Sequence, residues 1–365
     1  MLMNQVKSRK IVFVHLLNDY SGSPLVLSNV IKGLQQKGYE CELITCADSD
    51  GFLSRIDGVK YHFFKYRWHP NKYIRLLLFL LSQLLLFFKI LQFRKEAVNI
   101  YINTILPFGA ALAGRLIHKK ITYHLHEVSI KPLLLKRFLR WIAEITSSQN
   151  IYVSNYLKEK EGFPKVEGTT VYNALSSFFM ENADRLIKKA KSFSPFTILM
   201  LCSLKDYKGV KEFVKVADKL ENIHFNLVIN ASSQMIETYF TGTQKPANLS
   251  IFSSQTNVHP FYQKAHIVMN LSHPEQWIET FGMTLLEGMY YGLPCIAPPV
   301  GGPTEIIENN KDGFLIDQRN IDKIIACIRQ LQSNQELYQT VSRNAKLKSQ
   351  RFNFSEMVSQ IHDLM

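Results

Sequence analysis

Short apolar runs alternate with amphipathic stretches along most of the chain. Such runs stand at 11–14, 38–45, 99–103, 121–125, 150–153 and 170–172, and a second series follows at 196–201, 225–229, 249–252, 267–269 and 295–297. Short buried runs separated by helical patterns predict βαβ units, and consecutive βαβ units form parallel sheets. The pattern therefore predicts an α/β protein. After Leu315 the pattern is helical to the end of the chain.

The two series of predicted strands indicate two domains. A polar stretch at 181–194 separates them, and each series reads as a doubly wound sheet. We therefore place an N-terminal Rossmann-like domain at 1–190 and a second one at 191–345. Ligands of such sheets bind beyond the carboxyl ends of the strands, so two facing sheets would share one cleft.

One apolar segment stands apart from the strand and helix pattern. Residues 76–88 are all apolar except Ser82 and Gln83, and lysines and arginines lie on both sides of the segment. A bilayer-spanning helix needs about 20 apolar residues. Three interpretations stay open: a helix lying in the headgroup region of an anionic membrane, a helix buried in the first domain, and a membrane span. The first is favoured because the flanks are basic.

Composition narrows the classes of partner and compartment. With 46% hydrophobic and 20% charged residues the chain is globular, and its net charge of +13 favours an acidic partner. We expect no nucleic-acid binding, because no Lys/Arg run, zinc-ligand spacing or RNA-binding aromatic motif occurs. Five cysteines without a C-x-x-C pair, and a polar stretch at residues 1–10, predict a cytoplasmic protein without a signal peptide.

The densest cluster of functional signals begins at Glu279. A second carboxylate, Glu287, follows eight residues later, and Gly282 lies between them in a position where backbone can approach a ligand closely. A helix beginning after Gly282 would present unpaired N–H groups, which suit a phosphate, while the carboxylates suit hydroxyl groups. Phosphate flanked by hydroxyl-rich rings describes a nucleotide-sugar. A glycine pair, Gly301 and Gly302, predicts a second helix N-terminus beside the first.

These motifs resemble the donor site of retaining GT-B glycosyltransferases of family 4, and most closely the bacterial members that build lipopolysaccharide or capsule. The resemblance implies two Rossmann-like domains that face a central cleft, with a C-terminal helix at 346–365 returning to the first domain. It also implies that Glu287 binds the nucleotide ribose and that Glu279 is a catalytic residue at the donor-sugar hydroxyls. Phe281, Gly282, Met283 and Thr284 would meet sugar and phosphate.

The resemblance extends to a phosphate-binding loop after the first strand of the second domain. Lys208, followed by Gly209, matches the lysine that holds the donor diphosphate, but Ser203 stands where the family has an arginine. This departure removes a bidentate phosphate ligand. Lys205, which lies in the same loop, is the candidate that compensates for it. An ordinary solvated loop charge is the alternative for either lysine.

In the first domain the resemblance points to His126 and to a glycine-containing loop. His126 follows a predicted strand at its carboxyl end and matches the family histidine over the reacting sugar, where it would donate to a sugar hydroxyl or to the leaving oxygen near neutral pH. A core histidine is the alternative. Gly22 and Ser23 correspond to the first glycine-rich loop, near the diphosphate or the acceptor. Asn173 resembles the asparagine that closes the first domain, although a structural role is equally open.

By resemblance, the activity is a metal-independent hexosyl transfer with retention, without a cofactor. The donor would be a UDP- or GDP-sugar, and the acceptor a glycan or a lipid-linked molecule in cell-surface polysaccharide synthesis. The enzyme would be cytoplasmic and peripheral on the anionic inner leaflet of the inner membrane. Two alternatives stay open: a non-catalytic, membrane-associated protein that retains the fold, as Ser203 would allow, and a sugar-nucleotide epimerase.

Overall fold

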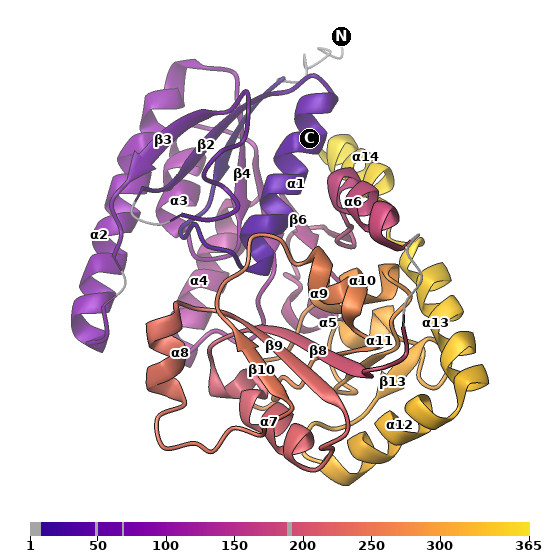
Figure 1. Cartoon of the computed structure of the whole chain (residues 1–365). Coiled ribbons are helices and arrows are strands. Elements are labelled where there is room, and N and C mark those ends of the chain that lie inside the picture. Colours follow the sequence, from indigo (N-terminus) through magenta and orange to yellow (C-terminus); the bar gives the residue numbers. More distant parts are fainter. Residues whose placement is uncertain (1–8, 48–49, 68, 188–191) are drawn as a thin grey trace. The chain divides into compact units, whose positions relative to one another are not determined.

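The structure is a computed structural model that describes residues 9–47, 50–67, 69–187 and 192–365 (Figure 1). The chain forms two compact units. The first comprises residues 1–172 and 355–365, and the second residues 173–354. The expected boundary at 190 and the first eight residues, on which part of the signal-peptide prediction rests, lie outside the described residues.

The first unit contains a seven-stranded parallel sheet in the order β3-β2-β1-β4-β5-β6-β7. Its strands are β1 (Lys10–Val14), β2 (Glu40–Cys46), β3 (Lys60–Phe64), β4 (Asn99–Asn103), β5 (Ile121–Leu125), β6 (Gln149–Tyr152) and β7 (Gly168–Thr170). Its helices are α1 (Gly22–Gln36), α2 (Lys72–Leu91), the 3₁₀ turn η1 (Gln92–Lys95), α3 (Phe108–Leu116), α4 (Leu133–Thr146), α5 (Asn155–Glu161) and α14 (Phe354–Leu364). Central strands β1, β4 and β5 are buried almost throughout, because helices cover both faces of such a sheet.

The second unit contains a six-stranded parallel sheet in the order β10-β9-β8-β11-β12-β13. Its strands are β8 (Thr197–Ser203), β9 (His224–Asn230), β10 (Leu249–Phe252), β11 (Ile267–Met269), β12 (Cys295–Ala297) and β13 (Gly313–Leu315). Its helices are α6 (Ser177–Ile187), η2 (Asp206–Lys208), α7 (Val210–Asp218), α8 (Ser233–Tyr239), α9 (His259–Lys264), α10 (Met283–Tyr290), α11 (Pro303–Ile306), α12 (Ile321–Ser333) and α13 (Gln335–Ser349).

The C-terminal helix α14 packs on the first unit, beside α1 (Figure 1). A Cβ atom at Gly33 of α1 would lie 2.3 Å from Val358 Cγ2, so the two helices touch where α1 has no side chain. Lys120 Nζ donates to the Leu364 carbonyl oxygen at 2.8 Å, and Asn99 Nδ2 donates to Met365 O at 3.3 Å. The returning segment begins at Ser355 and not at 346, because α13 continues to Ser349 within the second unit.

The first boundary also differs from the expected one. Helix α6 belongs to the second unit, where Asp184 accepts a hydrogen bond from the Tyr290 hydroxyl at 3.1 Å and Phe179 packs on His259 with ring centroids 4.5 Å apart. Because of these contacts, the two units divide between Tyr172 and Asn173 and not at the expected position 190. All five cysteines are free thiols, and only Cys202 is not buried.

Candidate active site

The candidate donor-binding residues of the second unit follow the carboxyl ends of its strands. Strand β8 leads into η2 and Lys208, β11 leads into Asn270, and the loop after β11 reaches Glu279 before α10 begins. Parallel strands all end at the same edge of the sheet, so segments far apart in sequence converge there. This convergence brings Lys208 and Glu279 together.

Lys208 and Glu279 form an ion pair. Lys208 Nζ lies 3.0 Å from Glu279 Oε2, and Asn270 Nδ2 donates to the same oxygen at 3.3 Å. Burial by itself would raise the pKa of Glu279, but the charge of Lys208 and the two hydrogen bonds lower it below its ordinary value. The carboxylate is therefore charged at neutral pH.

Lys208 also contacts the ring of Trp277, which in turn stacks on Tyr207. Trp277 stacks on Tyr207 with ring centroids 5.5 Å apart and 15° between the planes, and Lys208 Nζ lies 5.7 Å from the Trp277 centroid. Such contacts between a cation and an aromatic face add to the attraction of the ion pair. His273 lies near the same loop, with Nε2 3.0 Å from Glu212 Oε2. Lys208 thus has a fixed position.

Helix α10 begins at Met283 directly after Gly282. Gly282 adopts φ 106° and ψ 60°, a region that favours glycine, and no side chain caps the helix. An uncapped N-terminus leaves backbone N–H groups and a partial positive charge available to an anion. Phe281 is buried and packs on Phe352, whereas Met283 and Thr284 are half-buried at the first turn.

The glycine pair Gly301 and Gly302 packs against the backbone of residues 279–281, in the loop before α10. The Gly302 N–H donates to Glu279 O at 2.8 Å. A Cβ atom at Gly301 would lie 2.3 Å from Glu279 O, and one at Gly302 would lie 2.3 Å from Phe281 Cα. The helix that follows, α11, has only four residues. The predicted second helix N-terminus is therefore present as one short turn that begins at Pro303, and the close backbone contact of the glycine pair fixes residues 279–281.

Glu287 lies on the inner side of α10. Its side chain is buried and accepts a hydrogen bond from the Tyr262 hydroxyl at 2.6 Å. Burial raises the pKa of Glu287 to about 7, although the Tyr262 hydrogen bond opposes the shift. Tyr262, on α9, stacks on Tyr291 with centroids 5.5 Å apart. Glu287 is thus held in one position but is near its titration point at neutral pH.

The two remaining phosphate-loop positions are less enclosed. Lys205 is exposed and precedes η2, while Ser203 ends β8 and accepts through its carbonyl oxygen from the Lys205 N–H at 2.8 Å. A Cβ atom at Gly209 would lie 2.2 Å from Leu271 O, so this glycine allows the loop to pack against the segment after β11. The loop therefore places Lys208 inward and Lys205 outward.

In the first unit, His126 belongs to a cluster at the ends of three adjacent strands. His15 follows β1, Asn103 ends β4 and His126 follows β5. His126 Nε2 lies 2.9 Å from Asn103 Oδ1, and Asn103 Nδ2 reaches Ser23 O at 3.2 Å. His124 lies on the same side, as the alternation predicts, with its ring centroid 4.4 Å from that of His126. This position is the topological switch point of the sheet.

The hydrogen bonds of Asn103 determine the tautomer of His126. Because the Ser23 carbonyl oxygen can only accept, the Asn103 amide NH₂ points to it and Oδ1 points to His126, whose Nε2 must carry the hydrogen. Burial, with His124 and His15 close by, lowers the pKa of His126 well below its ordinary value. The ring is neutral, with Nε2 as its donor atom toward Asn103 and Nδ1 as its acceptor atom.

The glycine-containing loop before α1 is more open. A Cβ atom at Gly22 would meet nothing within 4 Å, and Ser23 is half-buried. Packing therefore does not require glycine at position 22. Glu127, beside His126, is a carboxyl group whose pKa burial raises to about 7, with several hydrogen bonds opposing the shift. Asn173 is the first residue of the second unit, and it is buried.

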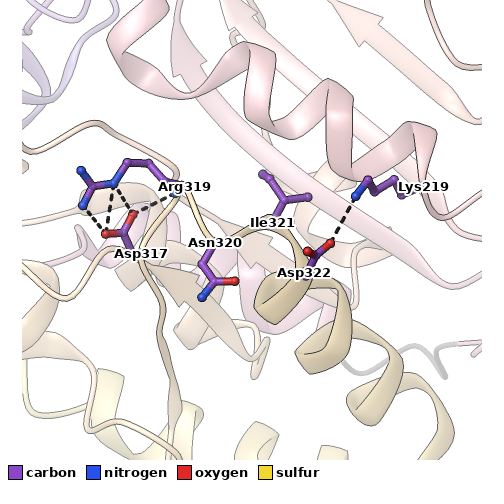
Figure 2. Close-up of a pocket in the computed structure, with 6 residues that line it drawn as sticks. All are labelled: Lys219, Asp317, Arg319, Asn320, Ile321 and Asp322. Atoms are coloured by element: carbon purple, nitrogen blue, oxygen red, sulfur yellow. Dashed lines mark hydrogen bonds and ion pairs between the residues drawn. The ribbon is translucent and has the colours of Figure 1, made fainter.

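A shallow depression elsewhere in the second unit contains none of the predicted site residues (Figure 2). The Asp317 carboxylate accepts four hydrogen bonds from Arg319 there, and Asp322 pairs with Lys219 at 3.2 Å. Its charges are already paired. Within residues 9–47, 50–67, 69–187 and 192–365, no group of three or more His, Cys, Asp or Glu side chains is arranged to hold a metal ion.

Three residues of the site were not predicted from the sequence. Asn270 contacts Glu279, Tyr262 contacts Glu287, and Asn103 contacts His126. Asn270 and Asn103 occupy strand ends, a signal that the sequence does carry. Tyr262 lies inside α9, on a segment that gave no functional signal.

Comparison with known proteins agrees with this geometry. Residues 183–348 match the family model of glycosyl transferases group 1. An uncharacterized glycosyltransferase of Haemophilus influenzae is 24% identical over 356 residues, covering 95% of this chain and 97% of the relative. The findings support a glycosyltransferase with the GT-B fold.

Solved structures show the same GT-B fold at low sequence identity. Anabaena Alr3699/HepE in complex with UDP-glucose superposes with a TM-score of 0.79 at 18% identity, covering 97% of this chain and 98% of that one. The lipopolysaccharide outer core galactosyltransferase WaaB gives 0.63 at 18% identity, covering 98% and 100%. The glycosyltransferase match contains Lys208, Glu279 and Glu287, whereas His126 lies before it.

Proposed function

We propose that this chain is a retaining, metal-independent hexosyltransferase that transfers a sugar from a nucleotide-sugar to a glycan or lipid-linked acceptor in cell-surface polysaccharide synthesis. The observation that carries the proposal is the ion pair between Lys208 and Glu279, next in sequence to the uncapped start of α10. In a nucleotide-sugar, the β-phosphate and the sugar ring share one oxygen. A cation for phosphate and a carboxylate for hydroxyl groups must therefore lie side by side.

The donor-binding roles follow from the chemistry of each group. Lys208 and the α10 N-terminus would stabilise the charge that develops on the departing diphosphate, because both are fixed before reaction. Glu279 would accept from the sugar hydroxyls, and Glu287 from the ribose hydroxyls. Lys205 would supplement Lys208 at the position of the family's missing arginine. UDP- and GDP-sugars are the proposed donors, and HepE was solved with UDP-glucose.

The transfer itself is proposed as a front-side displacement. The bond between the anomeric carbon and the diphosphate oxygen breaks, the acceptor oxygen bonds to the same face of that carbon, and the acceptor proton moves to the departing phosphate. His126, which Asn103 holds in one orientation, would contact the transferred sugar. Gly22 and Ser23 would approach the diphosphate or acceptor. The location proposed for this reaction is the cytoplasm.

The test uses purified protein with a panel of UDP-, GDP- and ADP-sugars. A thermal-shift screen identifies the donor, and mass spectrometry then follows nucleoside diphosphate released in the presence of a lipid-linked glycan acceptor. Lys208→Ala should abolish most turnover. Lys211→Ala, which removes an exposed lysine paired with Asp206, is the matched control and should retain it.

The outcome separates the proposed enzyme from the alternatives. Release of nucleoside diphosphate with a product of unchanged anomeric configuration by NMR supports retaining transfer. Conversion of the nucleotide-sugar without release of nucleotide indicates an epimerase. If no nucleotide-sugar shifts the melting temperature and none is consumed, a non-catalytic protein with this fold is the correct reading.

A further inference from the structure

The central segment of helix α2, residues 76–88, has its two polar side chains buried and most of its apolar side chains exposed. The buried positions of the whole helix are Phe79, Ser82, Gln83, Leu86 and Ile90, which include the only two polar residues of the central segment. Nine apolar residues are exposed by 42–71%: Tyr73, Ile74, Leu76, Leu77, Leu80, Leu81, Leu84, Leu85 and Phe88. A helix on a water-exposed surface has the opposite arrangement.

Specific contacts fix this orientation. Gln83 Oε1 accepts from the Gly109 N–H at 3.0 Å, and Gln83 Nε2 donates to Ser82 Oγ at 3.2 Å. A Cβ atom at Gly109 would lie 2.1 Å from Gln83 O, so the backbones of α2 and α3 are in contact. Turning the leucines inward would break these bonds and the close approach. The outward apolar face is therefore built into the first unit.

A second helix extends the apolar face. On α4, Leu134, Phe138, Trp141 and Ile145 recur at helical spacing and are exposed by 77%, 40%, 55% and 46%. Ring contacts connect the helices: Phe79 of α2 packs on Phe108 of α3 at 5.8 Å, and Phe108 packs on Phe138 at 5.2 Å. Leu139 and Ile142 fill the buried side of α4, so the exposed apolar side is additional to what the core needs.

The charges on and beside α2 are of one sign. Residues 65–95 contain seven lysines and arginines and no aspartate or glutamate. Lys72 and Arg75 lie at the start of α2, and Lys89, Arg94 and Lys95 at its end. A surface that binds another protein would carry charges of both signs at its rim. A surface that is apolar within and only positive at both ends of a helix matches anionic headgroups over acyl chains.

We propose that the exposed face of α2 and α4 is a membrane-docking surface, which lies in the interface of an anionic lipid bilayer. The segment Lys72–Lys95 is long and apolar enough to cross a membrane. A span, however, would require α2 to leave α3 and would place Gln83 in hydrocarbon. Lying flat, α2 extends about 30 Å along the bilayer. Trp141 and Tyr73 have the amphipathic rings that occupy this depth.

Binding to vesicles tests the proposal with the full chain. The wild type should sediment with vesicles containing phosphatidylglycerol, bind less to phosphatidylcholine alone, and be partly released by salt, since salt screens the basic residues. The triple variant Leu77→Ser, Leu80→Ser, Leu84→Ser should remain in the supernatant. Leu347→Ser on α13, where the leucine is exposed by 57%, is the matched control and should sediment like wild type.

Two further measurements keep the result decisive. Tryptophan fluorescence should be quenched by brominated lipids in wild type and quenched much less in Trp141→Phe, which does not depend on the folding of the triple variant. Unchanged circular dichroism and an unchanged thermal shift with nucleotide show that the triple variant is folded and that donor binding is separate. The proposal is overturned if wild type ignores anionic vesicles, or if the leucine face instead makes a dimer in light scattering.

Discussion

Replacing Glu287 by glutamine is expected to stabilise the second unit while weakening nucleotide binding. Glu287 is 7% exposed, and the Tyr262 hydroxyl donates to it at 2.6 Å. A glutamine carbonyl has nearly the same shape and can accept the same hydrogen bond. What the substitution removes is the cost of ionising a buried carboxyl group, which has raised its pKa to about 7.

The size of the effect follows from the pKa shift. Below pH 4.5, the ordinary value, Glu287 is protonated in both the folded and the unfolded chain and contributes no difference. Between pH 4.5 and about 7 the unfolded chain releases the proton while the folded chain keeps it. This difference lowers the free energy of unfolding by about 1.4 kcal/mol per pH unit, or about 3 kcal/mol above pH 7. Glu287→Gln has no carboxyl group to ionise at this position, so its free energy of unfolding does not fall in this way.

The assay is thermal or urea unfolding of both proteins from about pH 4.5 to about pH 8. The two should be similar at the acid end. At pH 8 the variant should unfold about 6–12 °C higher, because each kcal/mol shifts the midpoint of a domain of this size by about 2–4 °C. Glu336→Gln, at an exposed site on α13, controls for the loss of charge. A difference that does not change with pH, or a less stable variant at pH 8, refutes the reasoning.

Nucleotide affinity should change in the opposite direction. If the carboxylate accepts from ribose hydroxyls, Glu287→Gln loses a charge-assisted hydrogen bond of about 1.5–3 kcal/mol, or about tenfold to hundredfold in Kd. Calorimetry with the nucleoside diphosphate measures this directly. Affinity equal to that of wild type would show that Glu287 does not bind the ribose.

Three other outcomes are expected. Gly302→Ala should lower both stability and turnover, since its Cβ would lie 2.3 Å from Phe281 Cα, and an unchanged melting curve would contradict the close contact. Turnover should survive excess EDTA, since Lys208 and a helix N-terminus supply the positive charge; its loss with rescue by magnesium or manganese would overturn this assignment. Without the Asn103 side chain, the hydrogen of His126 is no longer fixed on Nε2. Asn103→Ala should therefore lower kcat more than it changes KM for the donor, and an unaltered kcat would contradict a positioning role.

The sequence determined the local elements and the spacing of the donor motif. Buried runs such as 11–14 and 121–125 are typical of central strands of a covered sheet, and the observed strands β1 and β5 confirm this prediction. Edge strand β3 was missed because Lys60–Phe64 is half-exposed and gives no continuous buried pattern. The interval from Glu279 to Glu287 was visible because a loop and the helix after it are local in sequence.

Tertiary structure alone decided which partners these elements meet. Lys208 reaches Glu279 across 71 residues and Asn103 reaches His126 across 23, because parallel strands bring their carboxyl ends to one edge whatever their order in the chain. The sequence pattern of α2 likewise predicted a helix, but it did not show which face of the helix is buried. Periodicity gives the two faces of a helix, and only the fit of Gln83 against Gly109 determines that the polar face is the inner one.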